Sequence, residues 1–339
     1  MLHLSHKRAW YDHVNERKIH SGEIPRLGGI GFGLAFIIIA TFISFFTRQM
    51  DFTIRFLPCV IALFISLVFG VLDDFRPLVP RNKLLLQFVA ALLVIIPGFT
   101  FERIIFLDSS GFLSNLGWLS YPITFLWLVG LTNAVNLIDG VDGLAGGLSA
   151  LIALSFAVIF FSFTETISVE LFCICLFGVL LGFLVFNAPL PRAKIFMGDG
   201  GSQFLGFALA LLPLLGEDET RAALPVLYAA ALLAIPIFDT IAAVWRRIRD
   251  HRRIDSPDTF HVHHKLLNLG FGARGVNAIL YSLQIVLSVL VFISIQVNGW
   301  RSLAILGIAY FVAITFFAII HFLNRRIIAA ARKSTITVK

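Results

Sequence analysis

Acidic and basic residues are scarce in this chain: Asp, Glu, Lys and Arg together make up 14% of its 339 residues. A soluble globular domain usually carries about 25% charged residues, so the composition excludes that class. Cysteine is also rare. Cys59, Cys173 and Cys175 all fall inside apolar runs, so neither a disulfide framework nor a zinc framework is indicated. The N-terminal 26 residues are too polar for a secretory signal peptide.

Apolar residues are abundant instead, at 58% of the chain. A helix that crosses the core of a bilayer needs about 20 consecutive, mostly apolar residues, and ten runs of that kind follow one another. The sequence therefore predicts an all-α, polytopic integral membrane protein whose residues 1–339 form a single domain. The ten predicted membrane helices cover residues 27–46, 53–72, 83–101, 117–136, 144–164, 168–186, 200–216, 221–242, 276–297 and 301–324.

The basic residues predict the orientation of these helices. If the ten segments alternate across the membrane, 22 of the 27 lysines and arginines lie on the face that holds the N-terminus. Lys and Arg are enriched in cytoplasmic loops, so we expect both termini in the cytoplasm. The net charge of +7 then surrounds the cytoplasmic membrane surface, and no nucleic-acid partner is expected. The other basic residues are Arg48, Arg55, Arg103, Arg221 and Arg301.

The unusual polar residues fall in four loops on that same predicted face. A charge at the centre of a bilayer costs about 2.5–3.5 kcal/mol, so we expect these acids at the membrane edge, where water and ions reach them. Four loops that are far apart in the sequence thus converge on one face. They contribute Asp73 and Asp74, then Asp139 and Asp142, then Asp199, and finally His261, His263 and His264.

Asp73 and Asp74 follow the second predicted helix, in the stretch GVLDDFRPLVPRNK. Adjacent carboxylates repel each other unless a cation or a proton separates their roles. A solvated turn before Pro77 is the simpler alternative. Lys83 opens the next helix, where its amine either takes part in a site or only extends to the membrane interface.

Asn133, Asn136, Asp139 and Asp142 recur every three residues in the stretch NAVNLIDGVDGLAGG. On a helix that spacing places side chains along one face, so we expect an oxygen-rich stripe that binds a ligand. The alternative is a helix that ends in glycine caps.

Three further stretches carry weaker signals. MGDGGS, which contains Asp199, enters an apolar helix, where backbone N–H groups can bind phosphate oxygens; a capped helix start is the alternative. HVHH, residues 261–264, follows the arginine-rich run WRRIRDHRR, which favours a phosphate contact, with a solvated loop as the alternative. Zinc is less favoured because no further ligand stands at a familiar spacing. PRLGGIGFG, residues 25–33, predicts close helix packing through small residues.

Carboxylates, an asparagine, a lysine and histidines on one membrane face suit Mg²⁺ and phosphates. Mg²⁺ prefers oxygen ligands and is usually held by one or two carboxylates plus substrate phosphates. A phosphate monoester that attacks a diphosphate is the demanding case, because both partners are anions. A proton-coupled or ion-coupled transporter is the alternative class, since intramembrane acids mark ion paths. Asp239, near the end of the eighth predicted helix, is its best candidate, although it would equally serve as a partner of the site.

Taken together, the motifs resemble those of the polyprenyl-phosphate N-acetylhexosamine-1-phosphate transferases of glycosyltransferase family 4. DD, NAVNLIDGVDGLAGG, FNAPLPRAKIFMGDGGS and HVHH occur in the family's order, and the resemblance covers about residues 12–275, including DHVNERKIHSGEIPRLGGIG. It implies transfer of N-acetylglucosamine 1-phosphate from UDP-GlcNAc to undecaprenyl phosphate at the cytoplasmic face of the plasma or inner membrane, with release of UMP. Such a reaction starts a lipid-linked cell-surface glycan, as in O-antigen, lipopolysaccharide or teichoic acid synthesis. Another UDP-N-acetylhexosamine donor is the alternative.

The resemblance also implies roles for individual residues. Asp73 matches the residue proposed as base or nucleophile, Asp74 supports it, and Lys83 lies near the phosphates. Asp199 matches the principal Mg²⁺ ligand, which Asn136 can join, with Mn²⁺ as an alternative ion. The loop with His261, His263 and His264 is expected to contact the diphosphate and the sugar. The nucleotide pocket is expected to include Asn136, Asp139, Asp142, Asn187 and Phe196, the last stacking on uracil.

Two features depart from the family's pattern. Members of the most similar branch usually have an additional helix before DHVNERKIH, where this chain has only about ten residues. HVHH also differs from the three consecutive histidines of the branch that transfers phospho-MurNAc-pentapeptide, which favours the N-acetylglucosamine branch. The sequence leaves open whether the protein is a monomer or a homodimer.

Overall fold

The computed structural model describes residues 24–46, 50–105, 115–163, 167–188, 192–215, 224–253, 256, 258 and 260–337. The elements within these residues are helices, with no extended strand among them. The predicted all-α class is therefore confirmed. The N-terminal stretch 1–23, where the family resemblance begins, lies outside the described residues.

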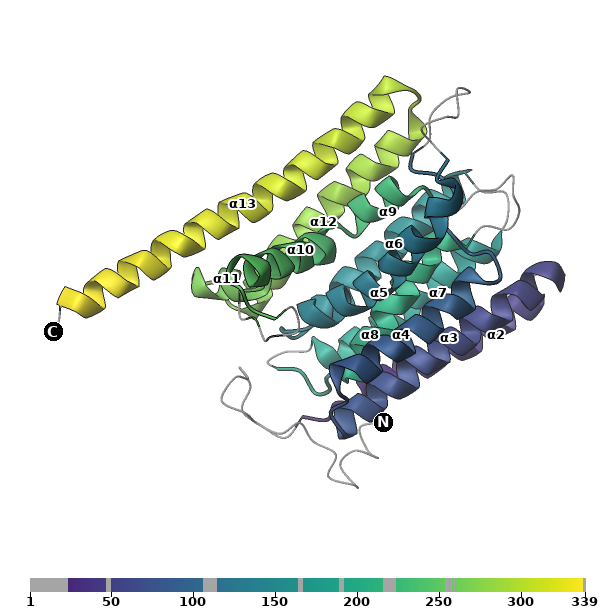
Figure 1. Cartoon of the computed structure of the whole chain (residues 1–339), viewed down its shortest axis with the longest axis horizontal. Coiled ribbons are helices and arrows are strands. Elements are labelled where there is room, and N and C mark those ends of the chain that lie inside the picture. Colours follow the sequence, from purple (N-terminus) through teal and green to yellow (C-terminus); the bar gives the residue numbers. More distant parts are fainter. Residues whose placement is uncertain are drawn as a thin grey trace. The chain divides into compact units, whose positions relative to one another are not determined.

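The chain divides into two compact units, Met1–Ala229 and Ala230–Lys339, which are considered separately below. The prediction of a single domain over 1–339 stays a prediction. The first unit holds α2 (Gly28–Phe46), α3 (Met50–Phe75), α4 (Pro80–Ile95), α5 (Ser120–Ile138), α6 (Leu144–Phe163), α7 (Ile167–Asn187) and α8 (Gly198–Leu211), and most of α9 (Val226–Leu232) (Figure 1). The second unit holds α10 (Ala234–Arg249), α11 (Val262–Asn268), α12 (Ala273–Gln296) and α13 (Trp300–Thr337).

Seven of the described helices are long and apolar enough to cross a membrane. The pair α9 and α10, which is bent by 87° at its break, adds an eighth only if the two helices form one span. The protein is thus a multi-pass membrane protein, whereas the predicted number of ten spans is not confirmed. The remaining two predicted segments correspond to α4 and α8, which have 16 and 14 residues. At about 1.5 Å per residue, both are shorter than the roughly 30 Å core of a bilayer. A turn at Gly98 (φ 95°) follows α4, and Pro213, which lacks an N–H, follows α8.

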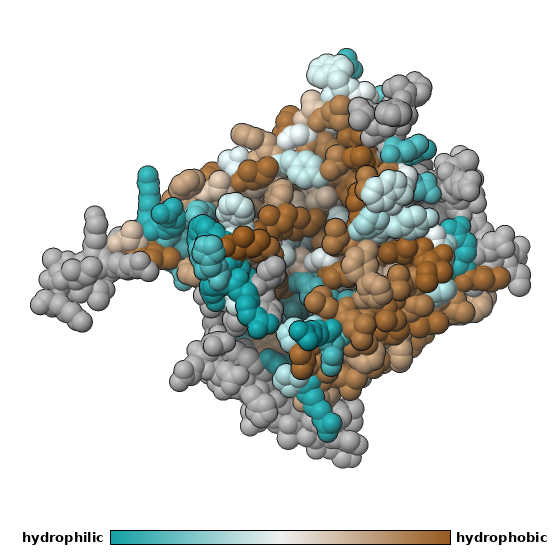
Figure 2. Space-filling model, in the orientation of Figure 1, coloured by the Kyte–Doolittle hydropathy of each residue, from teal (hydrophilic) through white to brown (hydrophobic). Residues whose placement is uncertain are grey.

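Large apolar side chains point outward from the long helices of the first unit. Figure 2 shows a brown, apolar surface over α2, α3 and α4. An apolar surface of this extent would be unusual on a soluble monomer, and it suits contact with lipid chains. Its exposed side chains include Ile38, Phe42, Phe45, Phe46, Ile54, Leu57, Ile61 and Phe64.

Helix α8 is the innermost helix of the first unit, and every residue from Gly200 to Leu211 is buried. Glycines let its first turn touch two neighbouring backbones. A Cβ atom on Gly29 of α2 would lie 2.2 Å from the Gly201 Cα, and one on Gly70 of α3 would lie 2.6 Å from the Gly200 Cα. The small-residue packing predicted for residues 25–33 is therefore confirmed, and it fixes the backbone that carries Asp199.

Candidate functional site

The start of α8 is held by a carboxylate from α3. Asp74 accepts hydrogen bonds from the backbone N–H groups of Asp199, at 2.8 Å, and Gly200, at 3.0 Å. The first N–H groups of a helix have no partner within the helix, and a negative charge there is favourable. Asp74 therefore caps α8 from a distant part of the chain, and its predicted support of Asp73 stays a prediction.

Asp73, Lys83 and Asp199 meet beside this cap. The Asp73 carboxylate forms an ion pair with the Lys83 amine, and it also accepts the backbone N–H of Leu78 at 2.7 Å. The Lys83 Nζ lies 4.0 Å from Oδ2 of Asp199. The Lys83 amine thus lies close to both the Asp73 and the Asp199 carboxylate. Two acids thus share one lysine, with Asp73 buried and Asp199 partly exposed.

Asn136 of α5 completes this cluster. Its side-chain amide donates to Asp199 Oδ1 at 3.1 Å and to the Ser202 hydroxyl at 2.8 Å. Asn133, one turn earlier, instead donates to Gln87 of α4 at 2.9 Å. The two asparagines therefore connect α5 to different helices near the acids.

The predicted stripe of four oxygens along one helix face is wrong for its last two members. Helix α5 ends at Ile138, and Asp139 leaves the helical conformation with ψ 70°, so Asp139 and Asp142 do not follow helical spacing. Burial raises the pKa of Asp139 to about 7, and the charges of Asp199, Asp74 and Asp142 add to this effect. Asp142 accepts the backbone N–H of Ala193 at 3.3 Å, which ties it to the loop before α8.

Asn187, at the end of α7, uses both ends of its buried amide within the protein. Its oxygen accepts the N–H of Gly143 at 2.9 Å, and its nitrogen donates to the carbonyl of Ile195 at 2.9 Å. Asn187 thereby joins the loop after Asp142 to the loop that carries Phe196. The Phe196 backbone bonds to Pro25 and Gly28, and its side chain is partly exposed. Contact of Asn187 or Phe196 with a nucleotide stays a prediction.

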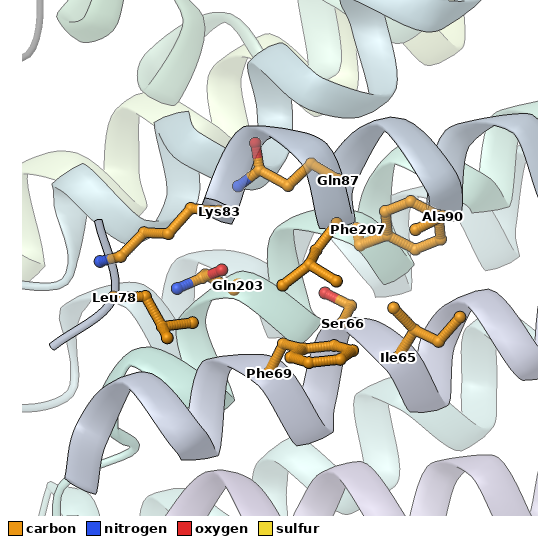
Figure 3. A pocket seen from close by; sticks show the side chains of 10 residues that line it. Ile65, Ser66, Phe69, Leu78, Lys83, Gln87, Ala90, Gln203 and Phe207 are labelled. Atoms are coloured by element: carbon orange, nitrogen blue, oxygen red, sulfur yellow. The ribbon is translucent and has the colours of Figure 1, made fainter. Parts of the chain in front are cut away.

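A small pocket adjoins Lys83 between α3, α4 and α8 (Figure 3). In Figure 3, Lys83 and Gln203 lie at the same end as Leu78, whereas Ile65 and Ala90 lie at the other. Its walls are mostly apolar. The lining residues are Ile65, Ser66, Phe69, Leu78, Lys83, Leu86, Gln87, Ala90, Gln203 and Phe207.

The predicted histidines lie in the second unit, which is described here by itself. His261 precedes α11, and its Nδ1 lies 2.8 Å from Oδ2 of Asp239 on α10. The His261 and His263 rings stack with a centroid separation of 5.9 Å, and the His263 and His264 rings are 4.2 Å apart.

The interior of this second cluster is basic and largely buried. His263 is buried, and its Nδ1 has no hydrogen-bond partner among the described residues. Burial, with the neighbouring His264, lowers the pKa of His263 to about 3. Burial also lowers the pKa of Lys265, and Arg246 reinforces that shift. Arg246 itself is paired with Asp258, its Nε lying 3.1 Å from Oδ2.

Known proteins are similar in sequence to this chain over most of its length. Glycosyl transferase family 4 matches residues 56–217. A probable undecaprenyl-phosphate N-acetylglucosaminyl 1-phosphate transferase from Bacillus subtilis is 35% identical over 314 residues, which cover 91% of this chain and 83% of that protein. The chain belongs to glycosyl transferase family 4.

Other relatives in the family have similar names. An undecaprenyl-phosphate alpha-N-acetylglucosaminyl 1-phosphate transferase from Escherichia coli K12 is 30% identical over 80% of this chain and 72% of its own length. A decaprenyl-phosphate N-acetylglucosaminephosphotransferase from Mycobacterium leprae is 31% identical over 78% of this chain and 72% of its own length. These matches confirm the family to which the motifs pointed.

The family implies a divalent metal ion, and the first unit offers a suitable set of donors. Asp73 and Asp199 bring two carboxyl groups together, and only one of them has its charge balanced closely by Lys83. Among the described residues, no group of three His, Cys, Asp or Glu side chains is placed to hold an ion. Mg²⁺ typically takes one or two protein carboxylates and completes its shell with water and phosphates. The acids at the start of α8 therefore fit an ion that is shared with a phosphate substrate.

The structure adds two residues, Gln87 and Ser202, that the sequence had not indicated, and it gives Asp239 a specific partner. Gln87 and Ser202 hold the two asparagines of α5, and Asp239 is bonded to a predicted site histidine. Gln87 and Ser202 are ordinary polar residues that stand within apolar runs. Their position among apolar residues was the one feature of the sequence that could have indicated a role. Asp239 had been noted as an intramembrane acid and now has a specific partner.

Proposed function

We propose that this protein transfers N-acetylglucosamine 1-phosphate from UDP-GlcNAc to undecaprenyl phosphate and releases UMP. The names of its Bacillus subtilis and Escherichia coli relatives support this substrate pair. The observation that carries the proposal is the meeting of Asp73, Lys83 and Asp199 at the capped start of α8. Another UDP-N-acetylhexosamine is the alternative donor.

The reaction joins two anions, so it needs a positive charge close to both phosphates. An oxygen of the lipid phosphate attacks the phosphorus that is bonded to the sugar. The bond from that phosphorus to the bridging oxygen breaks, and UMP leaves with that oxygen. Lys83 supplies a positive charge close to both acids, which lowers the repulsion between the two phosphates.

Asp73 has two alternative roles in this scheme. As a base, it takes the last proton of the lipid phosphate, whose pKa is near 6. As a nucleophile, it forms a covalent phospho-sugar intermediate that the lipid phosphate then attacks. Its ion pair with Lys83 favours the ionised carboxylate that either role needs.

Asp199, with Asp73 beside it, would hold Mg²⁺, or Mn²⁺ in its place. The ion would supply a positive charge for the leaving phosphate. Asn136 orients Asp199 through its amide and keeps the carboxylate toward the cluster. Asp139, Asp142 and Phe196 are our candidates for contact with uridine. His261, His263 and His264 are our candidates for contact with the sugar and the diphosphate.

The acceptor needs an apolar path to the acids because its polyprenyl chain stays in the membrane. The space in Figure 3 begins at Lys83 and continues between apolar side chains of α3, α4 and α8. We assign the acids to the cytoplasmic face, where nucleotide sugars are found, and the 22 basic residues on that predicted face support this orientation. The product would start a lipid-linked cell-surface glycan.

The proposal is tested by UMP release from purified protein in detergent with undecaprenyl phosphate and a panel of UDP-sugars. We expect release with UDP-GlcNAc and none without the lipid. Release with a different UDP-N-acetylhexosamine alone would replace the donor and keep the reaction class. No release with any donor would refute the transferase and favour a transporter, which uptake of the sugar or its nucleotide into vesicles would test.

A further inference from the structure

Asp239 and His261 form a buried acid–imidazole pair in the second unit. Oδ2 of Asp239 lies 2.8 Å from Nδ1 of His261, and Oδ1 accepts the backbone N–H of Val262 at 2.8 Å. The two residues are 1% and 4% exposed, respectively. A single carboxylate thus binds both the ring of His261 and the backbone that follows it.

This contact determines which nitrogen of the ring carries the proton. An ionised carboxylate only accepts hydrogen bonds, so the Nδ1 atom of His261 must carry a proton. The other ring nitrogen, Nε2, is then free to accept a hydrogen bond or, when the ring is protonated, to donate one. A buried carboxylate that fixes a histidine in this way is a recurring device in catalytic sites.

Other charged groups surround the pair, but they contact different atoms. Asp258 forms its ion pair with Arg246 and accepts the backbone N–H of Phe260. His263, His264 and Lys265 follow His261 on α11, and their pKa values are all lowered by burial. Asp239 is therefore the acid that is positioned to set the His261 tautomer.

We infer that Asp239 is a positioning residue of the transfer reaction, which acts by holding His261 with its proton on Nδ1 and its Nε2 available to the donor's phosphates or sugar. This inference rests on the proposed function. It assigns to Asp239 a task that differs from ion transport, and it explains why a buried acid lies within α10.

The substitution Asp239→Asn isolates the tautomer from the rest of the contact. The asparagine oxygen can still accept the Val262 N–H, while its NH₂ group now faces His261. Because an NH₂ group donates, Nδ1 must become the acceptor and the ring proton moves to Nε2. We expect kcat to fall by about 10–100-fold, by analogy with the loss of partners that orient metal-binding histidines, with KM for UDP-GlcNAc little changed.

A double-mutant cycle with His261→Gln distinguishes this role from a structural one. If Asp239 acts through His261, Asp239→Asn should change kcat by no more than about twofold once the histidine is gone. If Asp239 only stabilises the fold, Asp239→Asn should lower kcat by the same factor in the wild type and in His261→Gln. Asp258→Asn is the matched control, because this acid also binds a basic side chain and a loop N–H, and its effect should be equal in both backgrounds.

Two further measurements cover a variant that is poorly folded. Asp239→Glu keeps the carboxylate and should recover more kcat than Asp239→Asn. Nitrogen NMR of histidine-labelled wild type, with the His261 signals identified by their loss in His261→Gln, should show a protonated Nδ1. Equal losses in the cycle, or an unprotonated Nδ1 in the wild type, would overturn the inference while UMP release by the wild type still supports the proposed function. A wild type that releases no UMP refutes both.

Discussion

The carboxylate of Asp74 accepts the backbone N–H of Asp199 at 2.8 Å, although the two residues are 125 positions apart in the chain. The same carboxylate accepts the N–H of Gly200. Both oxygens of Asp74 therefore bind the start of α8, whereas the neighbouring Asp73 pairs with Lys83, whose amine also lies 4.0 Å from Asp199. Two adjacent acids thus have different partners: Asp74 caps a helix, and Asp73 pairs with a lysine.

Replacing Asp74 should therefore damage stability as well as activity. Asp74→Ala leaves two N–H groups at the start of α8 without a partner, which costs about 1–3 kcal/mol for each buried group. Asp74→Asn retains one acceptor oxygen and should lie between Ala and wild type in both properties. The measurements are the thermal unfolding midpoint in detergent and UMP release. An Asp74→Ala protein with wild-type stability and no activity would instead indicate direct contact with substrate.

The sequence predicted the family and the helices better than it predicted the geometry of this site. The helices and the acids at their ends were predictable, because apolar runs and isolated charges are visible without a structure. The capping of α8 by Asp74 was not, since it joins two segments that no local pattern relates. The four-residue stripe was predicted wrongly beyond Asn136, because the helix ends at Ile138 and the sequence does not fix that end to within one turn.

The glycine contacts around α8 lead to a second prediction. A Cβ atom on Gly70 would lie 2.6 Å from the Gly200 Cα and 2.8 Å from the Asp199 carbonyl oxygen. Backbone atoms cannot move aside as a side chain can, so Gly70→Ala should destabilise the protein by about 1–3 kcal/mol and should reduce UMP release by displacing Asp199. Gly178→Ala on α7 is the control, because a Cβ there has no neighbour within 4 Å. Equal stability of both variants would contradict the packing described for α8.

Removal of the metal should stop the reaction without unfolding the protein. Asp199 is the partly exposed acid of the cluster. Its carboxylate accepts a hydrogen bond from Asn136, and the Lys83 amine lies 4.0 Å away. We expect Asp199→Asn to abolish UMP release while the protein still purifies with wild-type thermal stability. EDTA should have the same effect on the wild type, and added Mg²⁺ should reverse it. Full activity in EDTA would remove the metal from the proposal.

The pair of Asp73 and Lys83 yields a prediction about which kinetic constant changes. If Asp73 acts on the lipid phosphate, Asp73→Asn should lower kcat far more than it raises the Kd for UDP-GlcNAc. Higher pH should partly restore the rate if Asp73 is a base, since solution then ionises the phosphate, whose second pKa is near 6. A covalent phospho-sugar adduct on Asp73 would favour the nucleophile. A weaker donor Kd with unchanged kcat would place Asp73 in the donor pocket instead.

His263 gives the protein a stability that depends on pH. Its ordinary pKa of 6.5 applies in the unfolded chain, whereas burial and His264 lower the pKa to about 3 in the folded protein. Above pH 6.5 the ring is neutral in both states. As the pH falls below 6.5, the unfolded chain takes up a proton that the folded protein cannot accept until about pH 3, so the folded protein loses stability. From pH 6.5 to pH 5 this loss amounts to about 2 kcal/mol for one group.

The measurement is the difference in thermal unfolding midpoint between pH 7 and pH 5, compared between variants so that other titrating groups cancel. Asp139, whose raised pKa acts in the opposite direction, is present in each variant. His263→Gln should lose less stability on acidification than the wild type, while His264 retains a slope of the same sign because its pKa is also lowered. His251→Gln is the control, since His251 is exposed. If His263→Gln and His251→Gln respond to pH as the wild type does, His263 is not held neutral by its burial.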